Sequence, residues 1–203
     1  MSSKHRAMSF NTKAKLRELG FPTVAAKAPD TAPFRNRAEI LRMMRKYSNL
    51  NPLESLYISG PVLSGKTWVG SRIALELHLL GARAEEIIYT TLMDMVSDML
   101  DSGASISKYY EIRFLFIDNV NTEKNAYAPS LLARVVRHRL DNDKHVAIIS
   151  SLDGSTFANL YGEEMQKRIE QFLQIELRCD EEALARIREA RFAKLAEDVS
   201  DVE

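Results

Sequence analysis

The feature that most constrains the fold of this chain is the octapeptide at residues 60–67, Gly60-Pro61-Val62-Leu63-Ser64-Gly65-Lys66-Thr67. It matches the pattern G-x-x-x-x-G-K-[ST]. An apolar run at residues 56–58 precedes it, and a helical pattern follows from Lys66 to Leu80. This strand–loop–helix order is the setting in which glycine-rich loops turn their backbone N–H groups toward phosphates. The sequence therefore predicts a P-loop, and a chance match is the weaker interpretation.

The residue types within the motif indicate which ligand it binds. The Lys66 ammonium can reach the β- and γ-phosphates, and the Thr67 hydroxyl can bind Mg²⁺. Residues 60–67 are therefore predicted to bind ATP together with Mg²⁺. Trp68, in the first turn of the following helix, completes the predicted cofactor-binding set, although core packing is the stronger interpretation of its indole ring.

A second element of the predicted site is the apolar run Phe114-Leu115-Phe116-Ile117, which ends in Asp118. The ends of parallel strands point at the ligand crevice of open α/β sheets. We therefore expect Asp118 to hold Mg²⁺, directly or through water, beside Thr67. The alternative is an acid that only caps a strand.

Asn119 is the most informative departure from an ordinary ATPase. It stands where many P-loop ATPases carry a glutamate that takes a proton from the attacking water. An amide can orient a water molecule but cannot accept its proton. We therefore expect weak hydrolysis, unless another base acts, with Glu123 the nearest candidate.

The rest of the chain alternates between strand and helix patterns, which predicts an α/β fold. Strands are expected at 56–58, 86–91, 113–117, 145–149 and 173–177, and helices at 37–47, 66–80, 92–100, 130–140, 162–172 and 180–196. Such alternation is typical of a parallel sheet, here of five strands, covered by helices on both faces. The nearly unbroken apolar strand at 113–117 belongs in its middle.

The length of 203 residues fits one domain with short extensions. We expect a basic flexible arm at 1–35, an ATPase core at 36–178 and a charged C-terminal helix at 179–203. Before Asn51 there are 11 basic residues and 3 acidic ones, so the arm could meet nucleic acid or an acidic partner, or be simply solvated. A single cysteine, Cys179, excludes an internal disulfide and favours a cytoplasmic setting. No apolar run reaches the roughly 20 residues that span a bilayer, so no membrane association is expected.

Several later motifs, at their spacing after the P-loop, resemble the DnaC/DnaI-type bacterial and phage helicase loaders, which are AAA+ ATPases. They are Thr122-Glu123, Arg137-His138-Arg139, residues 148–152, Tyr161-Gly162-Glu163 and Lys167-Arg168-Ile169. The resemblance runs from about Arg37 to Leu177. It implies an AAA+ fold in a compact, phage-like member, with the helical lid reduced or absent because few residues follow Leu177.

The resemblance also implies roles for single residues. Ser151 stands where the family has a sensor-1 asparagine, and Arg168 where it has an arginine finger that reaches a neighbouring subunit's ATP. Without the family, Arg168 would be interpreted as a surface arginine. Glu164 departs from the family, which often has an arginine there. Two further groups of residues are candidates. Arg137, His138 and Arg139 could contact single-stranded DNA or a neighbouring subunit, or form a solvated helix end. A sensor-2 arginine could be Arg186, Arg188 or Arg191.

The function implied is that of a helicase loader. Its expected partners are a hexameric replicative helicase, single-stranded DNA and further copies of this chain, with which it assembles when ATP is bound. Three alternatives stay open: a transposition-type AAA+ regulator that assembles on duplex DNA, an ATP-binding inhibitor of the helicase, and a small-molecule P-loop kinase. The kinase is the weakest, because no arginine-rich lid is visible between Gly81 and Tyr110.

Overall fold

The computed structural model describes residues 12, 14–22, 25, 35–47, 54–102, 106–121, 125–182, 185, 186 and 189. The alternative base Glu123 lies outside these residues, as do Thr122, Arg188 and Arg191. The domain boundaries at 35/36 and 178/179 stay predictions.

Five strands form one parallel sheet, as the alternation of patterns predicts. They are β1 (Leu56–Ser59), β2 (Ile87–Thr91), β3 (Phe114–Asp118), β4 (His145–Ser150) and β5 (Leu173–Glu176). Their order is β2-β3-β4-β1-β5, and every neighbouring pair is parallel. The buried strand β3 is flanked on both sides, which explains its unbroken apolar sequence.

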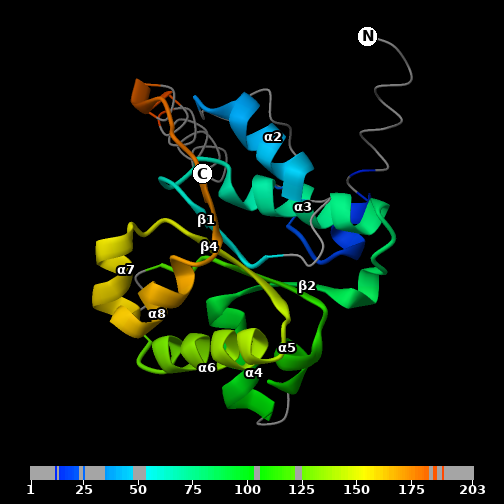
Figure 1. The fold of residues 1–203 in the computed structure, drawn as a ribbon, viewed down its shortest axis with the longest axis vertical. Coiled ribbons are helices and arrows are strands. Elements are labelled where there is room, and N and C mark those ends of the chain that lie inside the picture. The colour runs from blue at the N-terminus through cyan, green and yellow to red at the C-terminus, as the bar shows by residue number, and fades with distance from the viewer. Residues whose placement is uncertain are drawn as a thin grey trace, which may run out of the picture.

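Helices cover both faces of this sheet and complete three layers (Figure 1). On one face lie α2 (Arg37–Tyr47) and α3 (Lys66–Leu79). On the other lie α4 (Leu92–Ser102), α5 (Ser107–Glu111), α6 (Ala128–Asp141), α7 (Gly154–Tyr161) and α8 (Glu163–Ile169), while a short 3₁₀ turn, η3 (Ala84–Glu86), precedes β2.

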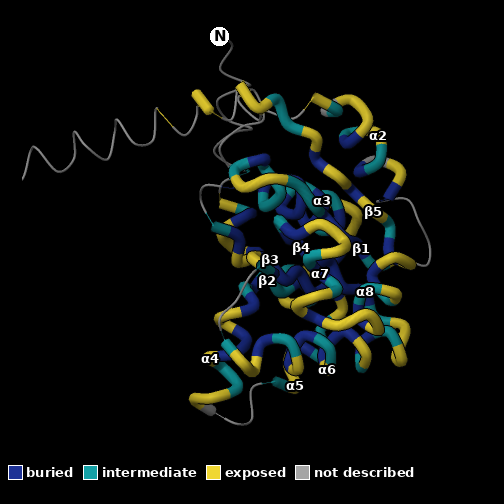
Figure 2. The backbone as a smooth tube through the Cα atoms, turned by 90° about the vertical axis from the view of Figure 1, so that its left-hand side faces the viewer, coloured by how far each residue is buried: buried dark blue, intermediate teal, exposed yellow. Residues whose placement is uncertain are grey.

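Alternate side chains of each strand feed the two cores. Phe114 and Phe116 join the core under α2 and α3, whereas Leu115 and Ile117 join the core under α4 to α8. Figure 2 shows the buried backbone concentrated along the strands, with exposed residues on the outer helices. The fold thus brings the carboxyl ends of β1, β3 and β4 to one edge of the sheet.

The helix expected at residues 162–172 differs from the sequence-based expectation. A separate helix, α7, precedes α8, and the two are divided by Gly162 at a φ of 88°. The Asp153 side chain accepts a hydrogen bond from the Thr156 N–H at 2.8 Å and so caps α7. The expected single helix at 162–172 is therefore only the second half of a helix pair.

The N-terminal segment at residues 14–22 packs on the core under α2 and α3. Residues 14–18 are helical, and Leu16, Leu19 and Phe21 are each at most 3% exposed. In Figure 1 this segment lies beside α3 and β2. The described part of the expected arm is therefore docked rather than free.

Arg139 corrects one expectation outright. It was expected to contact DNA or a neighbouring subunit, or to be solvated, but it is 0% exposed. Its guanidinium donates hydrogen bonds to main-chain carbonyls of five residues: Tyr109, Tyr110, Ile112, Arg113 and His145. Because it holds the α5–β3 connection to the start of β4, Arg139 has a structural role.

Candidate nucleotide-binding site

The loop at residues 60–67 has the backbone shape that a phosphate cradle needs. Gly60 has a φ of 147°, and a Cβ added there would lie 2.8 Å from the carbonyl oxygen of Leu177, so no other residue fits. Gly65 has a φ of 95° and leads directly into α3. Leu63 also has a positive φ, 70°, which costs a residue with a Cβ about 1–2 kcal/mol. The two glycines thus suit the loop conformation, whereas Leu63 is held in a conformation that its residue type does not favour.

The start of α3 is open for an anion. Gly65, as N-cap, offers no side chain to the first N–H groups, and the first turn contains no acidic residue. The Lys66 ammonium folds back on the loop and donates hydrogen bonds to the carbonyls of Gly60 at 2.9 Å and Pro61 at 2.8 Å. Burial lowers the pKa of Lys66, while the Asp118 carboxylate acts in the opposite direction. A phosphate would give both the N–H groups and the ammonium a negatively charged partner.

Thr67 and Asp118 lie in direct contact. The Thr67 hydroxyl donates a hydrogen bond to Asp118 Oδ2 at 2.6 Å, which joins the P-loop helix to the end of β3. A hydroxyl and one carboxylate, completed by phosphate oxygens and water, are the ligands that Mg²⁺ takes in nucleotide sites. The residues present therefore fit Mg²⁺, and when bound the ion would neutralise phosphate charge.

Two further groups hold the Asp118 carboxylate. The Tyr89 hydroxyl donates to the same Oδ2 at 2.8 Å, and the Asn119 N–H donates to Oδ1 at 2.7 Å. Burial, and then the negative Asp118, raise the pKa of the Tyr89 hydroxyl. Tyr89 therefore stays protonated and can only donate to Asp118.

Asn119 follows β3 in the left-handed region, with a φ of 56°, and is exposed. Asparagine tolerates this conformation better than most residues. Its main chain thus serves Asp118, and its side chain lies at the surface, where it has no basic group to activate water.

Ser151 is bound to a residue that the sequence did not single out. Its N–H and its hydroxyl both donate to Asn121 Oδ1, at 2.9 and 2.7 Å. The Tyr161 hydroxyl donates to the main-chain carbonyl of Asn121 at 2.8 Å. Ser150 is level with Ser59, so this pair of side chains lies beside the start of the P-loop. Asn121 thus places a carboxamide next to the position expected for sensor 1.

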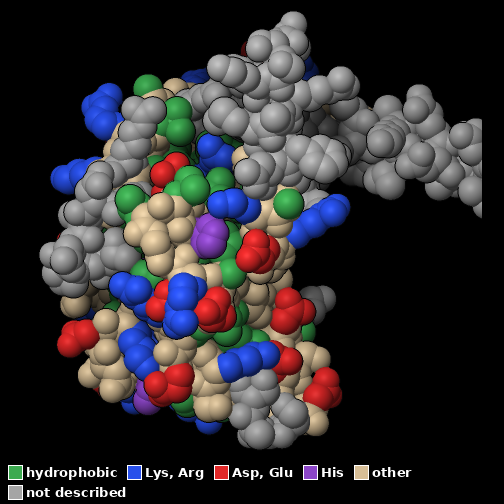
Figure 3. All heavy atoms as spheres, turned by 90° about the vertical axis from the view of Figure 1, so that its right-hand side faces the viewer, with side chains coloured by type: hydrophobic (Ala, Val, Ile, Leu, Met, Phe, Trp, Pro, Cys, Tyr) green, Lys and Arg blue, Asp and Glu red, His purple; other side chains and the backbone are tan. Residues whose placement is uncertain are grey.

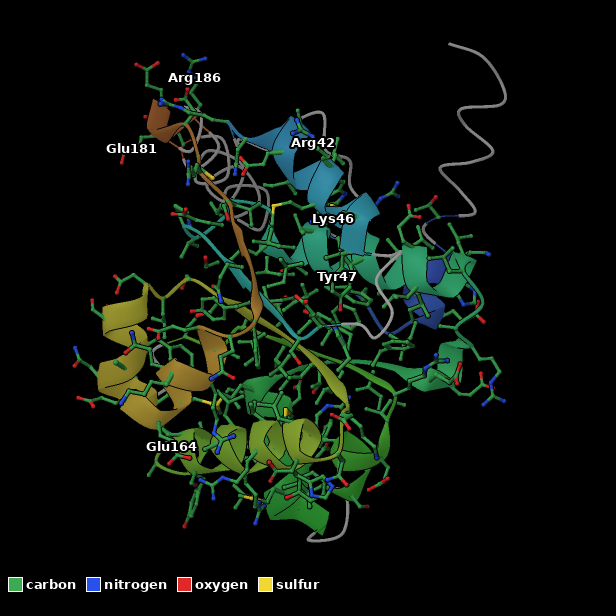
Figure 4. The ribbon with its side chains drawn as sticks, in the orientation of Figure 1. Arg42, Lys46, Tyr47, Glu164, Glu181 and Arg186 are labelled. Carbon is green, nitrogen blue, oxygen red and sulfur yellow. The ribbon has the colours of Figure 1, made fainter. Side chains whose placement is uncertain are left out.

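Arg168 lies on α8, with its side chain 32% exposed. It pairs with Glu164, and Arg137 of α6 pairs with the same carboxylate at 3.2 Å. Figure 4 shows Glu164 where α8 meets α6. The His138 ring lies tilted against the ring of Tyr110, with their centroids 4.3 Å apart, and Arg186 pairs with Glu182.

Two other residues of the predicted cofactor-binding set differ in exposure. Trp68 is 8% exposed and belongs to the core under α3, in keeping with the stronger interpretation of its indole. Val62 is 59% exposed at the tip of the loop.

Sequence analysis did not identify Cys179 as a neighbour of the loop at residues 60–67. The buried Ser64 hydroxyl makes no conventional hydrogen bond within the described residues, but the Cys179 thiol lies near it and near Lys66. Burial raises the pKa of this thiol, against the weaker opposite effects of Ser64 and Lys66. No sequence pattern signals this contact, because Cys179 lies far along the chain from the P-loop.

Comparison with solved structures places the fold. No family model matches the sequence, and no curated protein does. The structure is similar to the DnaC helicase loader (TM-score 0.58, 19% identity, 71% of this chain and 90% of that one) and to DnaI (TM-score 0.60, 17% identity, 70% and 85%). It is also similar to AMPPCP-bound DnaA from Aquifex aeolicus (TM-score 0.59, 18% identity, 78% and 51%).

The chain has the α/β P-loop fold of these solved structures. The expected fold class is thereby confirmed, and at these identities the likeness concerns the fold alone. The chain spans about half the length of several structures that it matches, among them DnaA bound to AMPPCP. None of the helices among the described residues is long and apolar enough to cross a membrane.

Proposed function

We propose that this chain is an ATP-binding AAA+ protein of DNA replication that acts as a helicase loader in the cytoplasm. Binding of ATP with Mg²⁺ would favour assembly of several copies on single-stranded DNA and on a hexameric replicative helicase. The observation that carries the nucleotide part is the 2.6 Å hydrogen bond from Thr67 to Asp118, which unites the two predicted Mg²⁺ ligands. The replication part is supported by the similarity to DnaC, DnaI and DnaA.

Within this proposal, binding matters more than turnover. Asn119 supplies no general base, and Ser151 is engaged with Asn121. We propose that the Asn121 carboxamide takes the part of the missing sensor-1 asparagine, with Ser151 as its positioning residue. Arg168 would act on the ATP of a neighbouring subunit after leaving Glu164.

The candidate contacts for DNA come from the basic N-terminal third. Arg42 and Lys46, one turn apart on α2, are exposed basic residues of this part of the chain that the structure describes (Figure 4). On the face drawn in Figure 3, basic and acidic side chains of the described residues are interspersed. Arg42 and Lys46 on α2 are therefore the candidate phosphate contacts in this proposal.

The experiment is retention of purified replicative helicase by the tagged chain, with ATP and Mg²⁺, with ADP, and in EDTA. A loader retains the helicase with ATP, and Lys66→Ala abolishes both ATP binding and retention. The control Lys108→Ala removes a lysine that pairs with Asp98 at 2.7 Å on the far side of the sheet, and it should behave as wild type.

Other outcomes of this experiment favour the alternatives. Retention in all nucleotide states, with unwinding blocked, would favour the helicase inhibitor. ATP-dependent binding to duplex DNA without helicase would favour the transposition-type regulator. Unchanged ATP affinity of Lys66→Ala by calorimetry would contradict the nucleotide site itself.

A further inference from the structure

Tyr89 contacts both Asp118, in the candidate nucleotide site, and Phe21, in the N-terminal segment. The proposed function gives no connection between these two parts of the molecule. Tyr89 lies on β2, where it is opposite Phe116 and Thr91 is opposite Asp118. Its hydroxyl binds Asp118, and its ring lies 4.5 Å from the ring of Phe21 in the N-terminal segment.

The hydroxyl end of Tyr89 fixes the carboxylate of the candidate Mg²⁺ ligand. A carboxylate oxygen has two lone pairs, and Asp118 Oδ2 accepts from both Thr67 and Tyr89. Oδ1 accepts a hydrogen bond from the Asn119 N–H. The carboxylate is therefore held in one orientation, with Oδ1 keeping an acceptor site for a cation or for a water bound to it.

The ring end of Tyr89 is held by the N-terminal segment. Phe21 is 3% exposed and also packs edge-on against Phe116 at 5.5 Å, one strand further into the sheet. Leu16 and Leu19 of the same segment are 1% and 2% exposed in this core. If residues 14–22 left, the Tyr89 ring would lose its packing partner and with it the restriction on where its hydroxyl lies.

We propose that Tyr89 is a positioning residue that couples docking of the N-terminal segment 14–22 to binding of Mg²⁺–nucleotide at Asp118. This inference rests on the proposed function, because it assumes that the P-loop binds ATP with Mg²⁺. Coupling is reciprocal: a docked segment that improves Mg²⁺–ATP binding is itself held more tightly when Mg²⁺–ATP is bound. The segment expected to meet a partner would thus report the nucleotide state.

The test uses the full chain and a fluorescent ATP analogue, titrated once with Mg²⁺ and once in EDTA. Tyr89→Phe keeps the ring on Phe21 but removes the hydroxyl, and it should weaken binding about tenfold with Mg²⁺ while changing it less than about twofold in EDTA. Tyr47→Phe is the matched control, since it removes a hydroxyl that donates to the Glu54 carbonyl at 2.8 Å, away from the site. Equal losses with and without Mg²⁺, or no loss, would overturn the proposal.

Two further measurements test the coupling itself. Phe21→Ala should also weaken Mg²⁺–ATP binding, and its effect should be less than additive with that of Tyr89→Phe. Amide hydrogen exchange of residues 14–22 should slow when Mg²⁺–ATP is added to the wild type, but not to Tyr89→Phe. Additive effects, or exchange that ignores Mg²⁺–ATP in the wild type, would contradict the coupling. Failure of the wild type to bind ATP at all would instead remove the proposed function.

Discussion

The guanidinium of Arg168 lies 3.1 Å from the carboxylate of Glu164, one turn earlier on the same helix. This exposed pair is weak, so an assembling neighbour could draw the arginine away at little cost. If Arg168 is an arginine finger, Arg168→Ala should leave ATP binding by the monomer unchanged and lower assembly-stimulated hydrolysis by about 10³-fold or more.

The decisive measurement on Arg168 mixes subunits. Arg168→Ala protein has an intact P-loop and Lys66→Ala protein has an intact finger, so their mixture should recover part of the activity that each lacks. Arg137→Ala, which removes the other partner of Glu164, is the control. A simple surface arginine would instead give Arg168→Ala protein that hydrolyses ATP like wild type.

Replacing Asn119 by glutamate should speed hydrolysis. The residue follows Asp118 at the exposed edge of the site, and a correctly placed general base contributes about 10²–10⁴ in rate. Steady-state phosphate release measures this, with Asn119→Gln as the control that lengthens the side chain without a basic group. A wild-type rate already equal to that of Asn119→Glu would show that another residue acts as base.

Asn121→Ala should lower hydrolysis and spare ATP binding. It removes the carboxamide that Ser151 holds through two hydrogen bonds. Loss of one such polar group from a transition-state site costs about 10²–10³ in rate. Ser151→Ala, which keeps the carboxamide and removes only one of its two donors, should have a smaller effect in the same assay. A larger loss in Ser151→Ala than in Asn121→Ala would instead assign the contact to Ser151.

Arg139→Met should destabilise the fold strongly. It would leave five buried or half-buried carbonyls without this donor, and each buried acceptor left unsatisfied costs about 1–3 kcal/mol. Arg137→Met, two residues earlier on the same helix and exposed, should change the free energy of unfolding by about 0.5 kcal/mol or less. Urea unfolding of both variants checks this, and equal stabilities would refute the structural role of Arg139.

His145 should make the fold sensitive to mild acid. Its ring packs among Tyr47, Phe114 and Phe116, and neither ring nitrogen has a hydrogen-bond partner within the described residues. Burial, and then the nearby Arg139 charge, lower the pKa of His145 from 6.5 to about 3. Because the folded-state pKa is lowered, protons bind His145 more readily in the unfolded chain than in the folded one. The free energy of unfolding is therefore highest above pH 6.5 and decreases as the pH falls toward 3.

Over this pH range, the titration of His145 changes the free energy of unfolding by about 1.4 kcal/mol per pH unit. Urea unfolding of wild type and His145→Phe at several pH values isolates it, because the other titrating groups are common to both. The variant should gain stability relative to wild type as the pH falls from 7 to 5. Parallel pH dependences would show that His145 does not titrate in this range.

The sequence by itself determined the α/β fold class and the position of the phosphate-binding loop. The G-x-x-x-x-G-K-[ST] motif between a strand and a helix, the alternation of elements and the apolar run before Asp118 are local patterns. Local patterns report the main-chain period and the conformational needs of single residues. They were enough to predict the parallel sheet with its strand boundaries, although not the helices α5 and α7. They also named Thr67 and Asp118, which the fold brings into contact.

The tertiary structure decided which polar side chains serve the site and which serve the core. Tyr89 reaches Asp118 across 29 positions of sequence and Asn121 reaches Ser151 across 30, since neighbouring parallel strands bring distant segments level. Arg139 belongs to a stretch whose charges suggest a surface, yet its guanidinium is buried because a bend before β3 presents carbonyls to it. Such contacts depend on the register between elements, and no single segment of the sequence encodes it.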